Sequence, residues 1–303
     1  MRENHPPDLP SLLPEQYGFH TRYFELPGLR VHAAEAGPLD SPLVVLLHGF
    51  PGFWYCWREQ MSSLSANNFH VIAPDQRGYN LTAKQGPYAL DILLADVAAL
   101  ITAAGQEKVF LAGHDWGAAV AWALAFTHPE LVEKLAILNV PHPYVMVQAL
   151  RRGNLRQLLK SWYIFFFQIP RLPEALLRRD NFFGLRRLLV GSGLPNTFSS
   201  ADLVTYTTAW SQPGVLNASI GWYRAMAKLS FSRLYHSLDR RVTCPTIILW
   251  GDQDVALEPS LGERSLEWCD DGRIVHYPGA SHWVQLDSVE LVNRELMKFF
   301  TAG

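Results

Sequence analysis

Cysteine is scarce in this 303-residue chain, which contains only Cys56, Cys244 and Cys269. An odd number of cysteines without paired spacing argues against a disulfide framework and against a zinc site. We therefore expect a reducing, cytoplasmic compartment and no metal. Long apolar runs are also absent, because stretches such as 43–47 and 164–167 are much shorter than the roughly 20 residues that span a bilayer. We expect no integral membrane segment.

An excess of charge of one sign is also missing, since 26 Lys and Arg residues nearly balance 28 Asp and Glu residues. The net charge of −2 gives no field that would favour nucleic acid as a partner. The charges are uneven along the chain, because residues 151–241 contain 14 basic and four acidic residues. That window carries +10 and the rest of the chain −12, which predicts a distinct structural unit in the middle.

Strand-like and helix-like patterns alternate in both terminal parts of the chain, which is typical of βαβ units around a parallel sheet. The expected strands are 43–47, 69–73, 109–112, 135–140, 246–250 and 273–277, and the expected helices are 90–104, 118–126 and 289–300. Residues from about 144 to 240 show helical patterns rich in Arg and aromatic residues instead. We predict one discontinuous α/β domain with a mostly parallel central sheet, formed by residues 1–141 and 242–303. Residues 142–241 would form an inserted helical cap.

The sequence Gly113-His114-Asp115-Trp116-Gly117 joins an expected strand directly to an expected helix. Such a sharp turn strains its central residue, exposes that side chain and needs small residues on both sides. The central residue is Asp115, and no Gly-x-Ser-x-Gly occurs in the chain. A carboxylate that attacks an sp³ carbon forms an alkyl ester, which water can hydrolyse, so Asp115 favours substrates such as epoxides or alkyl halides. Alternatively, Asp115 caps the helix in an ordinary turn.

A second motif, His-Gly-Phe-Pro at 48–51, follows the expected strand at 43–47. Folds with this type of nucleophile turn place the second half of the oxyanion hole here. The backbone N–H groups of Phe50 and Trp116 would then face the oxyanion that forms when water attacks an ester of Asp115.

A histidine and a carboxylate follow two later strands. His282 comes after the strand at 273–277 and could act as general base, while Asp254 comes after the strand at 246–250 and could orient the imidazole. The order nucleophile, acid, histidine is the one that such folds use. Asp252 is an alternative acid.

Together these segments resemble the α/β-hydrolase fold family, and within it the soluble epoxide hydrolases, over roughly residues 20–300. The resemblance rests on His-Gly-Phe-Pro at 48–51, Asp-Gln-Arg-Gly at 75–78, Gly-His-Asp-Trp-Gly at 113–117, Trp-Gly-Asp-Gln-Asp at 250–254 and Ser-His-Trp at 281–283. It implies a cis Phe50–Pro51 bond and favours Asp254 over Asp252. It also implies hydrolysis of a small-molecule epoxide to a vicinal diol, without a metal or organic cofactor.

The resemblance further implies two cap tyrosines that bind the epoxide oxygen and protonate it. The segments 162–168 and 221–224 look like those of the family, and they assign Tyr163 and Tyr223 as the pair. Alternatively, each is one more packed aromatic residue in a chain with 11 tyrosines. Phe50, Trp116 and Trp162 are expected to contact substrate in an apolar pocket that suits aryl or alkyl epoxides.

Three alternatives stay open. Haloalkane dehalogenases share the turn and the histidine, but they often have an Asn donor where Phe50 stands, and haloacid (fluoroacetate) dehalogenases have Arg where Trp116 stands. A fold of this kind can also be a catalytically silent scaffold. The oligomeric state is open, with a homodimer among the alternatives. The basic residues of the cap are expected on solvated helix faces, or else they attract anionic lipid-like epoxides or a membrane surface.

We expect four residues near these motifs to have structural and not catalytic roles. We expect Asp75 and Arg77 to fix a loop through a buried ion pair with each other. His114 should point into the fold and be hydrogen-bonded, and His142 should mark the hinge into the cap.

Overall fold

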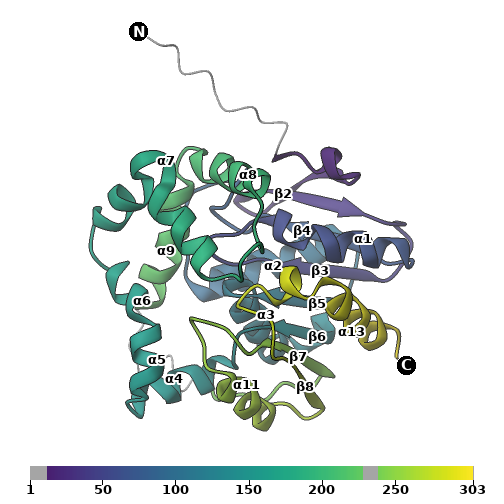
Figure 1. Ribbon diagram of the computed structural model, residues 1–303. Helices are drawn as coiled ribbons and strands as arrows, with labels where there is room; N and C mark the ends of the chain where they lie inside the picture. The colour runs from purple at the N-terminus through teal and green to yellow at the C-terminus, as the bar shows by residue number, and fades with distance from the viewer. Residues whose placement is uncertain (1–11, 228–237, 303) are drawn as a thin grey trace.

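The computed structural model describes residues 12–227 and 238–302, and an eight-stranded sheet forms its centre (Figure 1). The strands are β1 His20–Leu26, β2 Leu29–Ala36, β3 Leu43–Leu47, β4 His70–Pro74, β5 Val109–His114, β6 Val132–Leu138, β7 Thr246–Gly251 and β8 Gly272–Tyr277. Their order is β1-β2-β4-β3-β5-β6-β7-β8. The pairs β1/β2 and β2/β4 are antiparallel and the others are parallel, so the expected mostly parallel sheet is confirmed.

The hairpin of β1 and β2 is the part of the sheet that the sequence patterns did not predict. The apolar pattern of β2 is interrupted by His32 and Glu35, yet both residues are buried. Each has a partner on a neighbouring segment, because His32 lies 2.6 Å from Asp75 and Glu35 lies 2.8 Å from His70. Paired polar side chains of this kind are tolerated in a core. Because they interrupt the run of apolar residues, the strand cannot be recognised from its apolar pattern.

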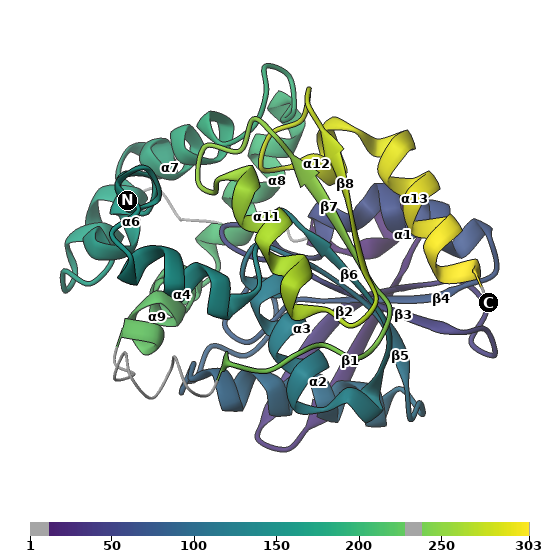
Figure 2. The ribbon, with the colours of Figure 1, turned by 90° about the horizontal axis from the view of Figure 1, so that it is seen from below.

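Helices cover both faces of the sheet (Figure 2). One face carries α1 Arg58–Ala66, α12 Val284–Asp287 and α13 Val289–Thr301, and the other carries α2 Leu90–Ala103, α3 Trp116–Thr127 and α11 Pro259–Ser265. Short 3₁₀ helices are η2 Pro14–Tyr17, η3 Trp54–Trp57, η4 Pro129–Leu131 and η5 Leu266–Trp268. Successive side chains of β3 point to opposite faces of the sheet, since Val44 packs on the α1 side and Val45 on the α2 side. A strand that is buried on both faces is a continuous apolar run.

Six helices lie between β6 and β7 in the described part of the chain. They are α4 Pro143–Arg151, α5 Leu155–Lys160, α6 Trp162–Phe166, α7 Leu172–Gly191, α8 Ser200–Ser211 and α9 Val215–Ala227. The ring of His142 caps the start of α4, where its Nδ1 atom accepts a hydrogen bond from the Tyr144 N–H. We call these six helices the inserted helices.

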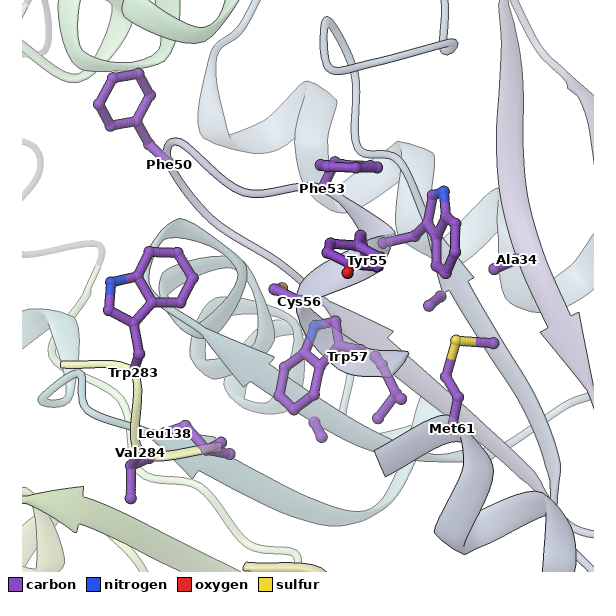
Figure 3. Packing of buried hydrophobic residues seen from close by; sticks show 14 of the residues in the cluster. Ala34, Phe50, Phe53, Tyr55, Cys56, Trp57, Met61, Leu138, Trp283 and Val284 are labelled. Carbon is purple, nitrogen blue, oxygen red and sulfur yellow. The ribbon is translucent and has the colours of Figure 1, made fainter. Parts of the chain in front are cut away.

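Hydrogen bonds join the inserted helices to loops at the carboxyl edge of the sheet. The indole N–H of Trp210 in α8 donates to the carbonyl of Pro51, and that of Trp222 in α9 donates to the carbonyl of Arg77. Figure 3 shows Phe50 at the tip of the loop after β3, with Phe53, Tyr55 and Trp57 following it into the core. The inserted helices therefore cover the edge at which the loops after β3 and β4 lie.

The expected ion pair between Asp75 and Arg77 is wrong. Asp75 contacts His32 and accepts a hydrogen bond from Asn80, whereas Arg77 makes two contacts of 2.6 Å with Asp96 in α2. The two side chains bind partners on different elements, so Asp75 ties the loop to β2 and Arg77 ties it to a helix.

Candidate active site

Asp115 occupies the turn between β5 and α3 with φ 52° and ψ −126°. This backbone region is unfavourable for a residue with a side chain, and such strain is concentrated at functional sites. The turn is tight because α3 starts against the end of β3. A Cβ atom at Gly117 would overlap the carbonyl of Leu47, and one at Gly113 would overlap the backbone of Gly117. Both glycines are thus required for the turn.

The loop after β3 contacts the Asp115 carboxylate directly. The backbone N–H of Phe50 donates a hydrogen bond of 2.6 Å to Oδ1 of Asp115. A Cβ atom at Gly49 would overlap that carboxylate, so a glycine is needed for this close approach. The Phe50–Pro51 bond is cis, as expected.

His282 lies between two carboxylates. Its Nδ1 atom is 2.8 Å from Oδ2 of Asp254, and its Nε2 atom is 3.5 Å from Oδ2 of Asp115. The alternative acid, Asp252, points elsewhere and contacts Nδ1 of His276 at 2.7 Å. The structure therefore brings Asp115, His282 and Asp254 together, with the imidazole between the two carboxylates.

Asp254 is buried and is surrounded by hydrogen-bond donors. The backbone N–H groups of Ala256 and Leu257 donate to Oδ1, and the side-chain amide of Asn139 donates to Oδ2 at 2.9 Å. Burial alone would raise the pKa of Asp254, but His282 and these donors outweigh burial and lower it. Asp254 is accordingly charged at neutral pH.

Asn139 is a site residue that the sequence reasoning missed. It follows β6 directly, has a φ of 50°, and also binds the backbone N–H and carbonyl of Gly251. One signal was present, because Asn139 is a polar residue at the carboxyl end of an apolar strand, where sites in parallel sheets form.

The charge of His282 follows from its neighbours. Burial of the ring opposes its charged form, but the carboxylates of Asp254 and Asp115 outweigh burial and raise the His282 pKa to about 10. His114 packs against this ring, and its Nε2 atom lies 2.8 Å from the carbonyl of His282, as expected for a hydrogen-bonded structural histidine. Burial, with the nearby His282 charge, lowers the His114 pKa to about 3.

A cavity of about 520 Å³ opens above Asp115 and His282. It is lined by Phe50, Pro51, Asp115, Leu159, Lys160, Trp162, Tyr163, Arg187, Leu188, Gly191, Ser192, Tyr223, Val255, Ala256 and His282. The predicted residues Tyr163, Tyr223, Trp162 and Phe50 are therefore all at the cavity. Trp116 is not among the lining residues, and its ring packs against Tyr223 with 5.0 Å between ring centroids.

The two tyrosines form an aromatic group with the loop after β3. The rings of Tyr163 and Tyr223 are 5.9 Å apart and nearly perpendicular, and Tyr223 also contacts Phe50 at 5.5 Å. Burial raises the pKa of both phenols, and the negative charge of Asp115 adds to the effect. Both hydroxyl groups are therefore protonated at neutral pH and available as donors in a largely apolar cavity.

Lys160 connects the inserted helices to the loop that carries the acid. Its ammonium group, at the end of α5, donates to the carbonyls of Asp254 at 2.7 Å and Leu257 at 3.3 Å. Sequence reasoning also missed this residue, because a lysine at the end of an amphipathic helix is ordinarily solvated.

No group of three or more His, Cys, Asp or Glu side chains in residues 12–227 and 238–302 could hold a metal ion. None of the helices in these ranges is long and apolar enough to cross a membrane.

Residues 42–289 match the family model described as the alpha/beta hydrolase fold. The chain belongs to the alpha/beta hydrolase fold family. Among its relatives in this family, the AB hydrolase superfamily protein YfhM of Bacillus subtilis (strain 168) is 40% identical over 285 residues, 93% of this chain and 98% of that protein. Epoxide hydrolase 4 of Homo sapiens is 38% identical over 281 residues, 90% of this chain and 76% of the relative.

A solved structure is also similar to this chain. The crystal structure of an epoxide hydrolase from Bacillus megaterium in complex with an inhibitor matches with a TM-score of 0.84 and 30% sequence identity. The match covers 93% of this chain and 100% of that chain. The predicted fold class is confirmed.

Proposed function

We propose that this protein is an epoxide hydrolase that forms a covalent ester on Asp115. One observation carries the proposal: the Asp115 carboxylate, the imidazole of His282 and the phenols of Tyr163 and Tyr223 all line one cavity. The epoxide hydrolases among the relatives and solved structures support the substrate class. A carboxylate suits this reaction because its alkyl ester can be hydrolysed at the carbonyl carbon.

In the first step the Asp115 carboxylate attacks an epoxide carbon, and the bond between that carbon and the epoxide oxygen breaks. The oxygen develops negative charge and takes a proton from Tyr163 or Tyr223. A phenol in a cavity with few water contacts is an effective donor to an alkoxide. The tyrosine later regains its proton from solvent.

Formation of the ester removes the negative charge of Asp115. His282 then has one neighbouring carboxylate instead of two, so its pKa falls from the value of about 10 that it has in the free enzyme. The ring releases its proton to solvent, which balances the proton that the tyrosine takes up, and can then act as a base toward water. Asp254 keeps the ring in the required orientation through the contact at Nδ1.

In the second step water loses a proton to His282 and adds to the carbonyl carbon of the ester. The Phe50 N–H already donates to an oxygen of Asp115, which supports a role for it as a donor to the oxyanion that forms there. The Trp116 N–H, which begins α3 next to Asp115, is the second proposed donor. When the tetrahedral intermediate collapses, the bond between the carbonyl carbon and the alkoxy oxygen breaks, and the leaving oxygen takes the proton of the added hydroxyl group, which gives the diol and restores the carboxylate.

The substrate body is proposed to be apolar. Leu159, Trp162, Leu188 and Val255 line the cavity, and side chains of this kind suit an aryl or alkyl epoxide. Phe50 offers no side-chain donor to a halide, which favours an epoxide over a haloalkane.

A substrate panel tests the proposal. The purified protein would be given an aryl epoxide, a long alkyl epoxide, a haloalkane and fluoroacetate, with diol and halide release both measured. We expect diol from the epoxides in the wild type and none from the Asp115→Ala variant. Asp252→Ala is the matched control and should retain turnover, since Asp252 contacts His276 instead of the site. Halide release alone would indicate a dehalogenase, and no product from any substrate would indicate a silent scaffold.

A further inference from the structure

Large apolar side chains are exposed mainly on one part of the inserted helices. Between residues 155 and 190 the exposed ones are Leu155, Leu159, Trp162, Phe165, Ile169, Leu172, Leu176, Phe183 and Val190. Outside this segment the described residues contribute only Tyr23, Leu39, Val204, Val255 and Leu291. Exposed apolar side chains that concentrate in one segment of a chain indicate an interaction site, whereas scattered single ones do not.

Two of these exposed residues also line the cavity. Leu159 of α5 and Trp162 of α6 are 74% and 60% exposed, and both line the cavity wall. Leu155 lies one helical turn before Leu159 on the same face of α5. Figures 1 and 2 show α6 and α7 at the side of the molecule away from the sheet. The surface therefore lies at the entrance to the site and not at the back of the fold.

The same segment is strongly basic. Residues 151–190 contain nine Arg and Lys residues and only two acidic residues, Glu174 and Asp180. Both acids already have partners, because Glu174 binds Arg224 and Asp180 binds Arg179. Arg152 and Arg156 flank the exposed Leu155, and Arg187 joins the cavity wall. The surface therefore presents exposed Leu, Phe and Trp side chains in a segment where cations outnumber acidic groups.

We propose that the surface of α5, α6 and α7 docks on an anionic lipid bilayer, with the cavity mouth turned toward the lipid. Short helices with Trp, Phe and Leu on one side and Arg or Lys beside them bind at membrane interfaces in this way. The apolar side chains enter the boundary between headgroups and acyl chains, and the cations bind the headgroups. A second copy of the chain is a poorer occupant, because two surfaces of the same strong positive charge would repel each other.

Docking of this kind gives an apolar substrate a direct path into the cavity. An aryl or alkyl epoxide partitions into lipid, and the mouth between Leu159 and Trp162 would face that reservoir. Only this use of the surface rests on the proposed function. Membrane binding itself is measured without turnover, so its failure and the failure of the epoxide hydrolase proposal are separate results.

Co-sedimentation with vesicles tests the proposal. The full chain would be mixed with phosphatidylcholine vesicles that either contain phosphatidylglycerol or lack it. We expect binding to the anionic vesicles, roughly tenfold weaker binding to the neutral ones, and release by salt because exposed charges are screened. Equal binding to both vesicles, or binding to neither, would overturn the proposal.

Two double variants locate the surface. Leu155→Ser with Phe165→Ser removes exposed apolar groups, and Arg152→Glu with Arg156→Glu reverses two cations. Each should weaken binding to anionic vesicles by roughly tenfold or more. The matched controls are Leu39→Ser with Val204→Ser, at residues that are 62% and 63% exposed, and Lys108→Glu with Arg294→Glu. The controls should bind like the wild type.

Folding and self-association are checked on the same samples. Circular dichroism and hydrolysis of a water-soluble epoxide without vesicles should be unchanged in all four variants. Sedimentation velocity would reveal a dimer. A wild-type dimer that dissociates in the Leu155→Ser, Phe165→Ser variant, together with no vesicle binding, would instead identify the surface as an interface between copies.

Discussion

The side-chain amide of Asn139 donates a hydrogen bond of 2.9 Å to Oδ2 of Asp254, the same oxygen that His282 contacts. This bond is one of the factors that lower the Asp254 pKa. In the proposed mechanism Asn139 is therefore a positioning residue for the acid, since it contacts the reacting groups only through Asp254.

The Asn139→Ala variant should lose this donor. A hydrogen bond to a buried charged group contributes about 1.5–3 kcal/mol, so kcat should fall by roughly 10-fold to 100-fold. The acid limb of the kcat profile should also move to higher pH, because Asp254 is protonated more easily without the donor. The measurement is kcat as a function of pH. A variant that is less stable but keeps the wild-type profile would show that Asn139 supports only the fold.

The His282→Gln variant should form the ester and fail to hydrolyse it. Removal of the base leaves the attack by Asp115 intact, so the alkyl-enzyme should accumulate. Intact-protein mass spectrometry after mixing with an aryl epoxide should show a mass increase of one substrate molecule. The same change in an Asp115→Asn background should give no adduct. Rapid turnover without any adduct in His282→Gln would contradict the covalent route.

The Tyr163→Phe and Tyr223→Phe variants should each open the epoxide more slowly. A positioned general acid typically accelerates a reaction by 10²-fold to 10⁴-fold. Because the remaining tyrosine can compensate in part, the rate of ring opening should fall by about 10²-fold in each single variant. The double variant should lose more. Single-turnover kinetics measure this step. Tyr277→Phe is the control, because the Tyr277 hydroxyl has no described partner and does not line the cavity. Wild-type ring opening in the double variant would contradict the assignment.

Loss of the Asp115 charge should lower the His282 pKa. The pKa of about 10 in the free enzyme depends on two carboxylates, and Asp115→Asn removes one of these charges. NMR titration of the imidazole in the wild type and the variant measures the change. An unchanged or higher pKa in the variant would contradict the proton sequence proposed for the second step.

His114 should make the protein sensitive to acid. Its folded-state pKa of about 3 is below the usual value near 6.5, so the unfolded chain takes up a proton that the folded chain does not. Its contribution is fully present above about pH 6.5, and stability falls as pH decreases from there toward about 3.

Replacement of His114 by Gln should make this loss shallower by about 1.4 kcal/mol per pH unit. Urea unfolding over a pH series gives the slope of the free energy of unfolding against pH. His20→Gln, at an exposed residue of β1, is the control and should leave the slope at its wild-type value. A slope that is as steep in His114→Gln as in the wild type would rule out His114 as a source of acid sensitivity.

The positions of Asp115, Asp254 and His282 could be predicted because each follows a strand of the parallel part of the sheet. Parallel strands have their carboxyl ends at one edge of the sheet, so residues far apart in sequence meet there. Phe50 follows the same rule at the end of β3. These four positions depend on the order and the apolar pattern of the strands, and both can be read directly from a sequence.

The cavity wall could not be predicted in this way. Arg187, Leu188 and Ser192 reach the cavity because α7 is bent, with positive φ at Asp180, Asn181 and Phe182. The packing of the inserted helices depends on side-chain contacts across several helices. A helical pattern in the sequence indicates only which residues are apolar, so it does not predict these contacts. The ring of Trp116 lies beside Tyr223 instead of at the cavity for the same reason.

In the proposed mechanism the contact of Lys160 with the Asp254 carbonyl would link the choice of substrate to the rate of ester hydrolysis. The end of α5 forms part of the cavity wall, and the same residue holds the loop that carries the acid. A large substrate that displaces α5 would also disturb the carboxylate that orients His282. Engineering of α5 for bulkier epoxides would therefore have to keep a cation at residue 160, since a wider cavity without it would leave the acid loop without its anchor.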